Sequence, residues 1–326
     1  MSDADPLRDQ PILISVVIPT YNRAHLVARA IQTALDQSLR PAEIIVVDDG
    51  STDGTEDSVR QFGTAIRYIR QENCGGAYAR NRGVHASTRE WVSFLDSDDM
   101  WTTTHLERIA EAIVATQGGA DVYFDDMAVP DHAGLTWWGV GGFQISGKHE
   151  IVPDGADWVL REYQPMMLQS SVCKRTVFLE EGGLWGDLRS AHDTHFFLKV
   201  GIGRAMCAVQ GIGSILTADA PSLSRLTWSG MDERRYLNKT RAFRDILARK
   251  PQMTDPQRRL LREWIAASFW TIGGVAWRER RFGRFFLWVI QALLAEPRAA
   301  VRLFMGFWRP QASGIAQTPP SSTATH

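Results

Sequence analysis

Short apolar runs alternate with segments of helical periodicity along the first 125 residues. The apolar runs are typical of buried strands in a parallel sheet, and they lie at residues 12–19, 43–48, 66–70, 91–95 and 121–124. Apolar side chains with helical spacing predict helices at residues 24–37, 77–87 and 102–117, and a shorter helix from Thr52 or Asp53. This alternation of strand and helix predicts a doubly wound α/β sheet.

Polar clusters follow three of the predicted strands directly. They are Pro19–Arg23, Asp48–Ser51 and Asp96–Asp99. Ligands of open α/β sheets bind at the carboxyl ends of the strands. The three clusters therefore predict one ligand site at this edge of the sheet.

The cluster Asp96-Ser97-Asp98-Asp99 has three carboxylates within four residues. Without a cation these charges repel one another. Carboxylate oxygens together with substrate phosphates suit Mg²⁺ or Mn²⁺. The alternative is a solvated turn that caps the next helix. Asp48–Ser51 has the same two interpretations, as a turn or as a contact to a nucleotide.

Four ordered segments resemble the family 2 glycosyltransferases, which have the GT-A fold. They are SVVIPTYNR (15–23), IIVVDDGSTDGT (44–55), ENCGGAYARNRG (72–83) and FLDSDD (94–99). The resemblance is specific over residues 12–125, thin over 126–215 and generic beyond residue 250. It implies a GT-A domain at about 12–225 with a mixed doubly wound sheet, in which residues 128–165 are irregular and rich in Gly and Trp. Beyond this domain, the residues themselves predict a helical region at 226–310, where Thr254-Asp255-Pro256 is a cap with a first-turn proline that starts a helix. The Ser/Thr/Pro-rich composition of residues 311–326 predicts a disordered tail.

The resemblance also implies a nucleotide-sugar site, formed by Pro19, Thr20, Tyr21, Arg23, Asp49, Arg80, Asn81, Asp96 and Ser97. In such a site Asp49 contacts the base, and Arg80 and Asn81 shape the diphosphate side. Asp96-x-Asp98 resembles the family's DxD motif. Asp98 is then the direct metal ligand, with Mg²⁺ or Mn²⁺ as the ion.

Two further positions come from the same resemblance. Asp193 follows the Gly182-Gly183 element and aligns with the family's catalytic base, although it could instead only cap the helix at 192–203. His192 stands where relatives have a glutamate. Asp219 lies where many relatives have a metal-contacting histidine, and it is either a substitute ligand or an unrelated loop residue. The QxxRW motif of processive synthases is absent, which argues against a polymerising activity.

The charge of the chain is divided unevenly. Residues 1–224 have 18 basic and 30 acidic side chains, a net charge of −12, and residues 225–326 have 18 and 7, a net charge of +11. The basic part also has six of the 12 tryptophans, interleaved with arginines. Tryptophan and arginine on amphipathic helices suit an anionic membrane surface, and a helical hairpin packed on the catalytic domain explains them equally well.

The sequence predicts a cytoplasmic protein, with peripheral contact at the inner face of the membrane as one option. Its N-terminus lacks a signal-peptide pattern, and the longest apolar stretch, residues 285–295, is too short to span a bilayer. The three cysteines have no spacing for zinc or a disulfide framework.

The predicted function is that of an inverting, metal-dependent glycosyltransferase. It moves a sugar from a nucleoside-diphosphate donor to a hydroxyl of a sugar or lipid-linked acceptor, in surface polysaccharide or glycolipid assembly. The alternatives are a non-catalytic nucleotide-sugar-binding or scaffold protein, and a transferase that acts on polyprenyl phosphate. A nucleotidylyltransferase is disfavoured because PTYNR does not resemble its Gly-rich signature. No nucleic-acid motif accompanies the basic charge.

Overall fold

The structure, a computed structural model, describes residues 11–130, 134–217 and 233–307. In these residues a nine-stranded sheet has the order β3-β2-β1-β4-β8-β6-β9-β5, and β7 also pairs with β9. The strands are β1 (Ile14–Thr20), β2 (Glu43–Asp48), β3 (Arg67–Arg70), β4 (Trp91–Phe94), β5 (Met100–Trp101), β6 (Val122–Ala128), β7 (His149–Val152), β8 (Ser171–Lys174) and β9 (Met206–Ile215).

The helices of residues 11–217 lie between the strands along the chain. They are α1 (Val27–Leu35), α2 (Thr55–Arg60), α3 (Gly76–Ala86), α4 (His105–Ala115), α5 (Trp137–Gly141), α6 (Ala156–Val159), α7 (Arg175–Glu180) and α8 (His192–Gly201). The strands and long helices predicted for residues 12–125 and the helix at 192–203 are all confirmed, with ends that differ by a few residues.

The order of the first four strands determines where the ligand site lies. Strand β1 pairs in parallel with both β2 and β4, and β2 pairs in parallel with β3. The chain runs outward from β1 to β3 and then returns to the other side of β1 as β4, so the strand order reverses at β1 and β4. Ligands bind at such a switch point, beyond the carboxyl ends of the strands.

Helices cover both faces of β1, which explains its continuous apolar sequence. Val16 and Ile18 pack in one core cluster with α1 and α4, and Val17 packs in the other with α3. A Cβ atom on Gly83 would lie 2.3 Å from Cγ1 of Val17. Glycine at this position therefore lets α3 approach the strand closely.

The second half makes the sheet mixed. Strand β8 is antiparallel to both β4 and β6, and β9 is parallel to β6 but antiparallel to β5 and β7. The long strand β9 thus returns to the segment that follows Asp96–Asp99, where Ser214 and Ile215 pair with Trp101 and Met100. The predicted mixed sheet is confirmed, and the irregular stretch at 128–165 contains α5, β7 and α6.

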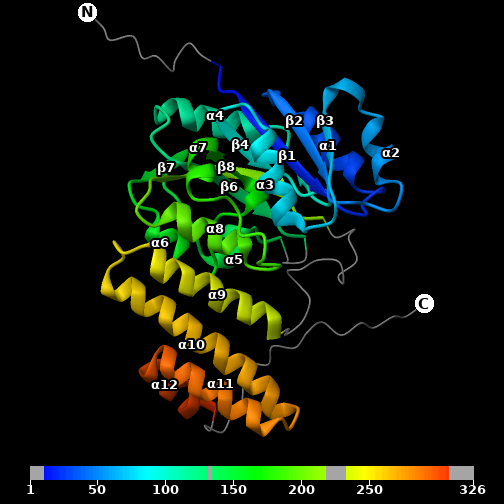
Figure 1. Ribbon diagram of the computed structural model, residues 1–326. Coiled ribbons are helices and arrows are strands. Elements are labelled where there is room, and N and C mark those ends of the chain that lie inside the picture. Colours follow the sequence, from blue (N-terminus) through cyan, green and yellow to red (C-terminus); the bar gives the residue numbers. More distant parts are fainter. Residues whose placement is uncertain (1–10, 131–133, 218–232, 308–326) are drawn as a thin grey trace, which may run out of the picture.

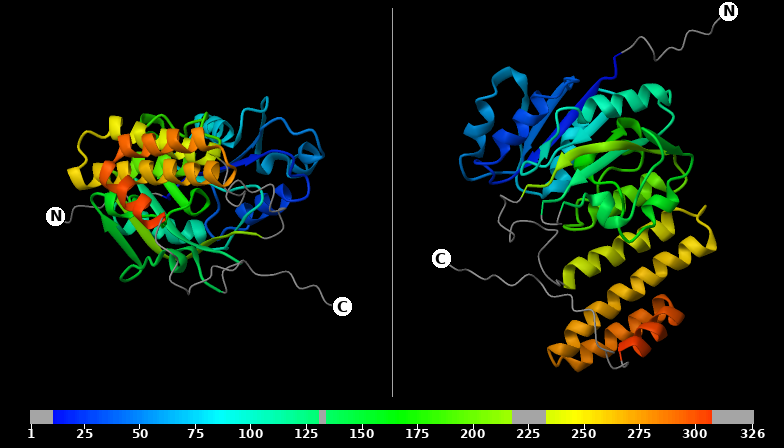
Figure 2. Two further views of the ribbon diagram at one scale, coloured as in Figure 1. Left: turned by 90° about the horizontal axis from the view of Figure 1, so that it is seen from below. Right: turned by 180° about the vertical axis from the view of Figure 1, so that it is seen from behind.

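Four helices follow the sheet and extend away from it (Figures 1 and 2). They are α9 (Glu233–Arg249), α10 (Asp255–Arg278), α11 (Phe282–Ala295) and α12 (Pro297–Phe307). The predicted start of α10 is confirmed, because Thr254 and Gln257 form a capping box around a first-turn proline. In the described part of the chain, no helix is both long and apolar enough to cross a membrane.

The apolar core runs without interruption from the sheet into these helices. Phe196 of α8, Phe243 of α9 and Phe269 of α10 belong to the same buried cluster as Phe124 of β6. The helical region is therefore attached to the sheet through a shared core. The predicted boundary at residue 225 and the predicted tail from residue 311 lie outside the described residues.

Candidate active site

A wide cleft opens at the switch point. Its volume is about 1310 Å³, and residues that follow β1, β2 and β4 line one side of it. Typical pockets for one small ligand have volumes of roughly 300–1,000 Å³. The cleft is therefore large enough for two substrates. The predicted residues that line it are Pro19, Thr20, Tyr21, Arg23, Asp49, Arg80, Asp96, Ser97, Asp98 and Asp193.

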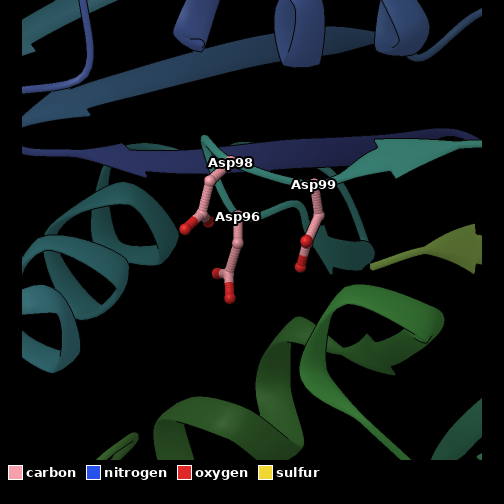
Figure 3. Close-up of side chains that lie close together, drawn as sticks. All are labelled: Asp96, Asp98 and Asp99. Atoms are coloured by element: carbon pink, nitrogen blue, oxygen red, sulfur yellow. The ribbon is translucent and has the colours of Figure 1, made fainter. Parts of the chain in front are cut away.

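Asp96, Asp98 and Asp99 form the acidic cluster of the cleft. One carboxylate oxygen from each lies within 4.8 Å of the others, and the three side chains project to the same side of the chain (Figure 3). Asp96 and Asp98 are partly exposed, whereas Asp99 is buried. Asp99 accepts long hydrogen bonds from the backbone N–H of Thr217 and from Gln169 Nε2, both at 3.3 Å.

The segment that carries the acidic cluster is held by β9. The hydroxyl of Thr217 donates to the carbonyl oxygen of Asp98, and Arg29 of α1 donates to that hydroxyl at 3.1 Å. These contacts fix the backbone on which Asp96 and Asp98 are presented to the cleft. Side chains that could bind a divalent cation are thereby arranged in advance.

Two arginines provide positive charge beside the carboxylates. Arg80 of α3 is buried and forms an ion pair with Asp96. Arg23 lies 3.8 Å from Asp98, between guanidinium nitrogen and carboxylate oxygen. The Nε of Arg80 and the hydroxyl of Thr20 are both buried without a hydrogen-bond partner among the described residues. These donors are suited to the oxygens of an anionic ligand.

The carboxylate of Asp49 organises the Gly-rich turn before α3. It accepts hydrogen bonds from the backbone N–H groups of Cys74 and Gly75, at 2.9 and 2.7 Å, and from Gln71 Nε2 at 2.6 Å. The preceding Asp48 is buried and accepts from Tyr68 and from the N–H of Ser51. Asp49 therefore shapes the wall of the cleft through its turn as well as lining it.

Asn81 is the predicted residue that does not line the cleft in this structure. Its side chain faces the loop after α7, where Nδ2 donates to the carbonyl of Leu184 at 2.8 Å and Oδ1 accepts from the N–H of Leu184 at 2.9 Å. Its predicted role on the diphosphate side stays a prediction. Asn81 secures a loop whose continuation, Gly186–Arg189, lines the cleft.

Asp193 lies in the first turn of α8 and lines the same cleft as the acidic cluster. Its Oδ1 accepts from the N–H of Thr194 at 2.8 Å. Burial lowers the pKa of the neighbouring His192, an effect that the Asp193 and Asp96 carboxylates oppose. The Nδ1 of His192 is buried without a hydrogen-bond partner among the described residues. A neutral imidazole therefore lies beside Asp193.

Helix α9 brings positive charge to the same end of α8. Arg235 lines the cleft, and Lys239 interacts with Asp193. Burial lowers the pKa of Lys239, as does the positive charge of Arg235, while Asp193 raises it. The sequence analysis did not assign α9 to the site, because nothing in its pattern shows that it packs against α8.

The remaining wall of the cleft is largely apolar and comes from residues 127–169. The side chains that the sequence analysis missed are Met127, Val129, Trp137, Val140, Tyr163, Met167, Leu168 and Gln169. The rings of Trp137 and Tyr163 pack edge to face with centroids 6.0 Å apart. Only the Gly- and Trp-rich composition of this stretch gave any signal. Asp219, the other predicted metal ligand, lies outside the described residues.

The mixed sheet, with its cleft at the switch point, is that of an α/β protein with the GT-A fold. Residues 15–183, more than half of the chain, match the family profile described as Glycosyl transferase family 2. The chain belongs to this family, so its resemblance to family 2 glycosyltransferases is confirmed.

The most informative curated relative is a putative teichuronic acid biosynthesis glycosyltransferase, TuaG, from Bacillus subtilis. It is 40% identical over 103 residues, which cover 30% of this chain and 41% of TuaG. The match therefore spans well under two thirds of that relative.

Two solved structures share the fold across most of the chain. TarS 1-349 of S. aureus in complex with UDP-GlcNAc has a TM-score of 0.64 at 17% identity, covering 89% of this chain and 83% of that one. The mannosyltransferase PcManGT of Pyrobaculum calidifontis, in complex with GDP-Man and Mn²⁺, has a TM-score of 0.55 at 19% identity. The match covers 92% of this chain and 81% of PcManGT.

Proposed function

We propose that this chain is a metal-dependent, inverting glycosyltransferase that moves a sugar from a nucleoside-diphosphate donor to an acceptor hydroxyl. The observation that carries the proposal is that Asp96, Asp98 and Asp193 line one cleft from different elements. Carboxylates that reach one cleft from different elements can serve different steps, one set at the leaving group and one at the attacking group. The family membership supports this assignment.

The donor side is the half of the cleft formed by β1, β2 and β4. Pro19, Thr20 and Tyr21 border the base, and Asp49 contacts it or fixes the turn beside it. Arg23 and Arg80 face the diphosphate, where their guanidinium groups offset the phosphate charge. The buried hydroxyl of Thr20 and the Nε of Arg80 gain partners when an anionic donor binds.

The acidic cluster fits a divalent cation. Asp98 and Asp96 present oxygens to the cleft, and hard carboxylate ligands suit Mg²⁺ or Mn²⁺. Asp99 is buried and holds Thr217 and Gln169, which assigns it a supporting role. When bound, the cation stabilises the negative charge of the departing nucleoside diphosphate. Binding of Mn²⁺ by PcManGT is consistent with this choice.

Asp193 serves as the general base. It removes the proton from the acceptor hydroxyl, and that oxygen then attacks the anomeric carbon in line with the departing diphosphate. The carbon–oxygen bond to the acceptor forms as the bond to the diphosphate breaks, so the configuration at the anomeric carbon is inverted. The positive charge of Lys239 interacts with the Asp193 carboxylate from α9.

The acceptor side is the wall formed by residues 127–169. Trp137 and Tyr163 offer ring faces and edges against which a sugar can pack, and Arg235 adds a positive charge. This composition favours a sugar hydroxyl, on a polysaccharide or lipid-linked intermediate, as the acceptor. The annotation of TuaG in teichuronic acid biosynthesis is in line with a role in surface polysaccharide assembly.

The first experiment is a thermal-shift screen of the full chain against UDP-, GDP- and dTDP-sugars, with and without Mn²⁺. We expect one nucleotide class to stabilise the protein, and to do so only with the cation. Release of nucleoside diphosphate from that donor then tests catalysis. A stabilising donor that is never hydrolysed or transferred with any acceptor supports a non-catalytic binding protein instead. Transfer to polyprenyl phosphate, but to no hydroxyl, identifies the other alternative.

A further inference from the structure

The outer surface of the last two helices is apolar. Nine of the sixteen large apolar side chains that are exposed in the described part of the chain lie there: Phe282, Phe286, Leu287, Ile290, Leu293, Leu294, Val301, Phe304 and Met305. We call this surface the α11–α12 face. Leu294, with 75% of its surface accessible, is the most exposed of all sixteen.

Helix α11 is apolar on two sides. Phe285 and Ala292 are buried, and the ring of Phe285 packs on Trp270 and Trp277 of α10. Phe286, Ile290 and Leu294 recur every four residues and form one row on the exposed side. A helix that only packs on its neighbour needs a single apolar stripe. The second stripe therefore requires its own explanation.

The tryptophans expected to contact a membrane do not form this face. Trp264, Trp270, Trp277 and Trp288 are all half-buried within the helical region. Trp264 packs on Phe243, and Trp288 stacks on Phe269 at 12° between the ring planes. The exposed apolar surface consists of Phe, Leu, Ile, Val and Met instead.

Arginines flank the α11–α12 face at both ends. Residues 278–302 contain six arginines and two glutamates, and all six arginines are exposed. Arg284 and Arg302 pair with Glu233 and Glu263, at 2.6 and 3.0 Å. Arg298, in the first turn of α12, has no ion pair among the described residues. An apolar face bordered by arginines is complementary to an anionic lipid surface.

We propose that the α11–α12 face docks the protein on an anionic lipid surface. The Phe, Leu and Ile side chains enter the boundary between headgroups and acyl chains, and the arginines bind lipid phosphates. These helices form the end of the molecule away from the sheet, so docking leaves the catalytic part clear of the lipid (Figures 1 and 2). The proposal is independent of the transfer reaction, since none of these side chains lines the cleft.

A second copy of the chain is the competing occupant of this face. In a two-fold dimer the face meets itself, so the flanking arginines of both copies approach one another. Ion pairs with Glu279, Glu233 and Glu263 compensate part of this charge, and the like charges that remain oppose such an interface. The excess of arginine over glutamate therefore favours lipid over a second copy.

The test is flotation of the full chain with vesicles of phosphatidylcholine, with and without phosphatidylglycerol. The wild type is expected to float with the anionic vesicles, and less in high salt. The variant Phe286→Gln/Ile290→Gln/Leu294→Gln should lower partitioning at least about tenfold. The control Leu135→Gln/Ile151→Gln/Ile212→Gln changes three exposed apolar side chains on the catalytic part and should float like the wild type.

A second variant tests the contribution of the arginines to lipid binding without altering the apolar surface. Arg280→Gln/Arg298→Gln should weaken binding to anionic vesicles several-fold, whereas Arg40→Gln/Arg89→Gln, also exposed, should not. Failure of the wild type to float with anionic vesicles overturns the proposal. So does equal flotation of the wild type and the apolar variant. Concentration-dependent dimerisation that the apolar variant abolishes, with no vesicle binding, assigns the face to a second copy.

Discussion

The guanidinium group of Arg80 pairs with the carboxylate of Asp96 on the donor side of the cleft. The two residues come from α3 and from the segment after β4, which meet at the switch point of the sheet. Arg80 is buried, so its charge is poorly screened by water. The same positive charge therefore offsets the acidic cluster and opposes a cation that binds there.

Replacing Arg80 should separate the binding of the cation from the binding of the donor. In Arg80→Gln the acidic cluster loses its nearest positive charge, so Mn²⁺ alone should bind about tenfold more tightly. The donor should bind at least about tenfold more weakly, because a phosphate contact is lost. Calorimetric titration with Mn²⁺, and then with the donor, measures both. Arg82→Gln, exposed on the same helix, is the control. An unchanged Mn²⁺ affinity contradicts the prediction.

Asp98 is expected to be required for metal-dependent turnover. Asp98→Ala removes a carboxylate that the acidic cluster presents to the cleft, and transfer should fall by at least about 100-fold. The rate at increasing Mn²⁺ concentration, with the donor found in the thermal-shift screen, is the measurement. Asp57→Ala, exposed on α2, should keep the wild-type rate. Full activity of Asp98→Ala at wild-type Mn²⁺ concentrations would rule out this assignment.

Replacing Asp193 should slow the chemical step and leave donor binding intact. Asp193→Asn keeps an oxygen that can accept from the N–H of Thr194 but cannot accept the acceptor's proton. We expect kcat to fall by about 10²- to 10⁴-fold, while donor-induced thermal stabilisation persists. Asp157→Asn, exposed on α6, serves as the matched control. If Asp193→Asn transfers sugar at the wild-type rate, Asp193 only caps the helix.

The donor half of the site was predictable because local sequence fixes it. Continuous β-branched runs make β1 and β2, and parallel pairing brings the clusters after their ends to one edge. The acidic cluster follows β4 at the same edge for the same reason. Thr20, Asp49 and Asp98 therefore line the cleft without any tertiary information beyond the strand order.

The acceptor half could not be predicted from the sequence in the same way. Trp137, Tyr163 and Arg235 reach the cleft from α5, from a loop and from α9, and no periodic pattern links these segments to the sheet edge. Strand β8 is also inserted antiparallel between β4 and β6, which the alternation of strand and helix does not indicate. The resemblance gave Arg80 and Asn81 the same role, but successive helical positions point in different directions.

The two hydrogen bonds between Asn81 and Leu184 lead to a further prediction. Asn81→Ala removes two hydrogen bonds to the backbone of Leu184, so the free energy of unfolding should fall by about 1–3 kcal/mol. Donor binding should be retained, and the acceptor KM should rise, because Gly186–Arg189 lines the cleft. Urea unfolding and acceptor kinetics measure the two effects. A selective loss of donor affinity instead would support the predicted role of Asn81 on the diphosphate side.

The free energy of unfolding should depend on pH through a buried histidine where α8 packs on α9. The buried His195 lies 2.8 Å from Asp245, measured from Nε2 to Oδ2, and burial lowers its pKa from 6.5 to about 4, against the opposing effect of Asp245. Lys199 and Arg249 also face this ring and oppose its protonation. The folded protein thus takes up this proton only near pH 4, whereas the unfolded chain takes it up near its ordinary pKa.

The difference between the pKa of His195 in the folded and unfolded states sets the direction in which stability changes with pH. The unfolded state binds more protons below pH 6.5, so the free energy of unfolding falls as the pH drops from 6.5 towards 4, by about 3 kcal/mol in total. Urea unfolding at pH 7.5 and pH 5 should show the loss in the wild type. His195→Gln should be less stable at pH 7.5 but should lose less on acidification, because glutamine does not titrate. The exposed His25→Gln should behave like the wild type, and an unchanged pH dependence in His195→Gln would assign the acid sensitivity to other groups.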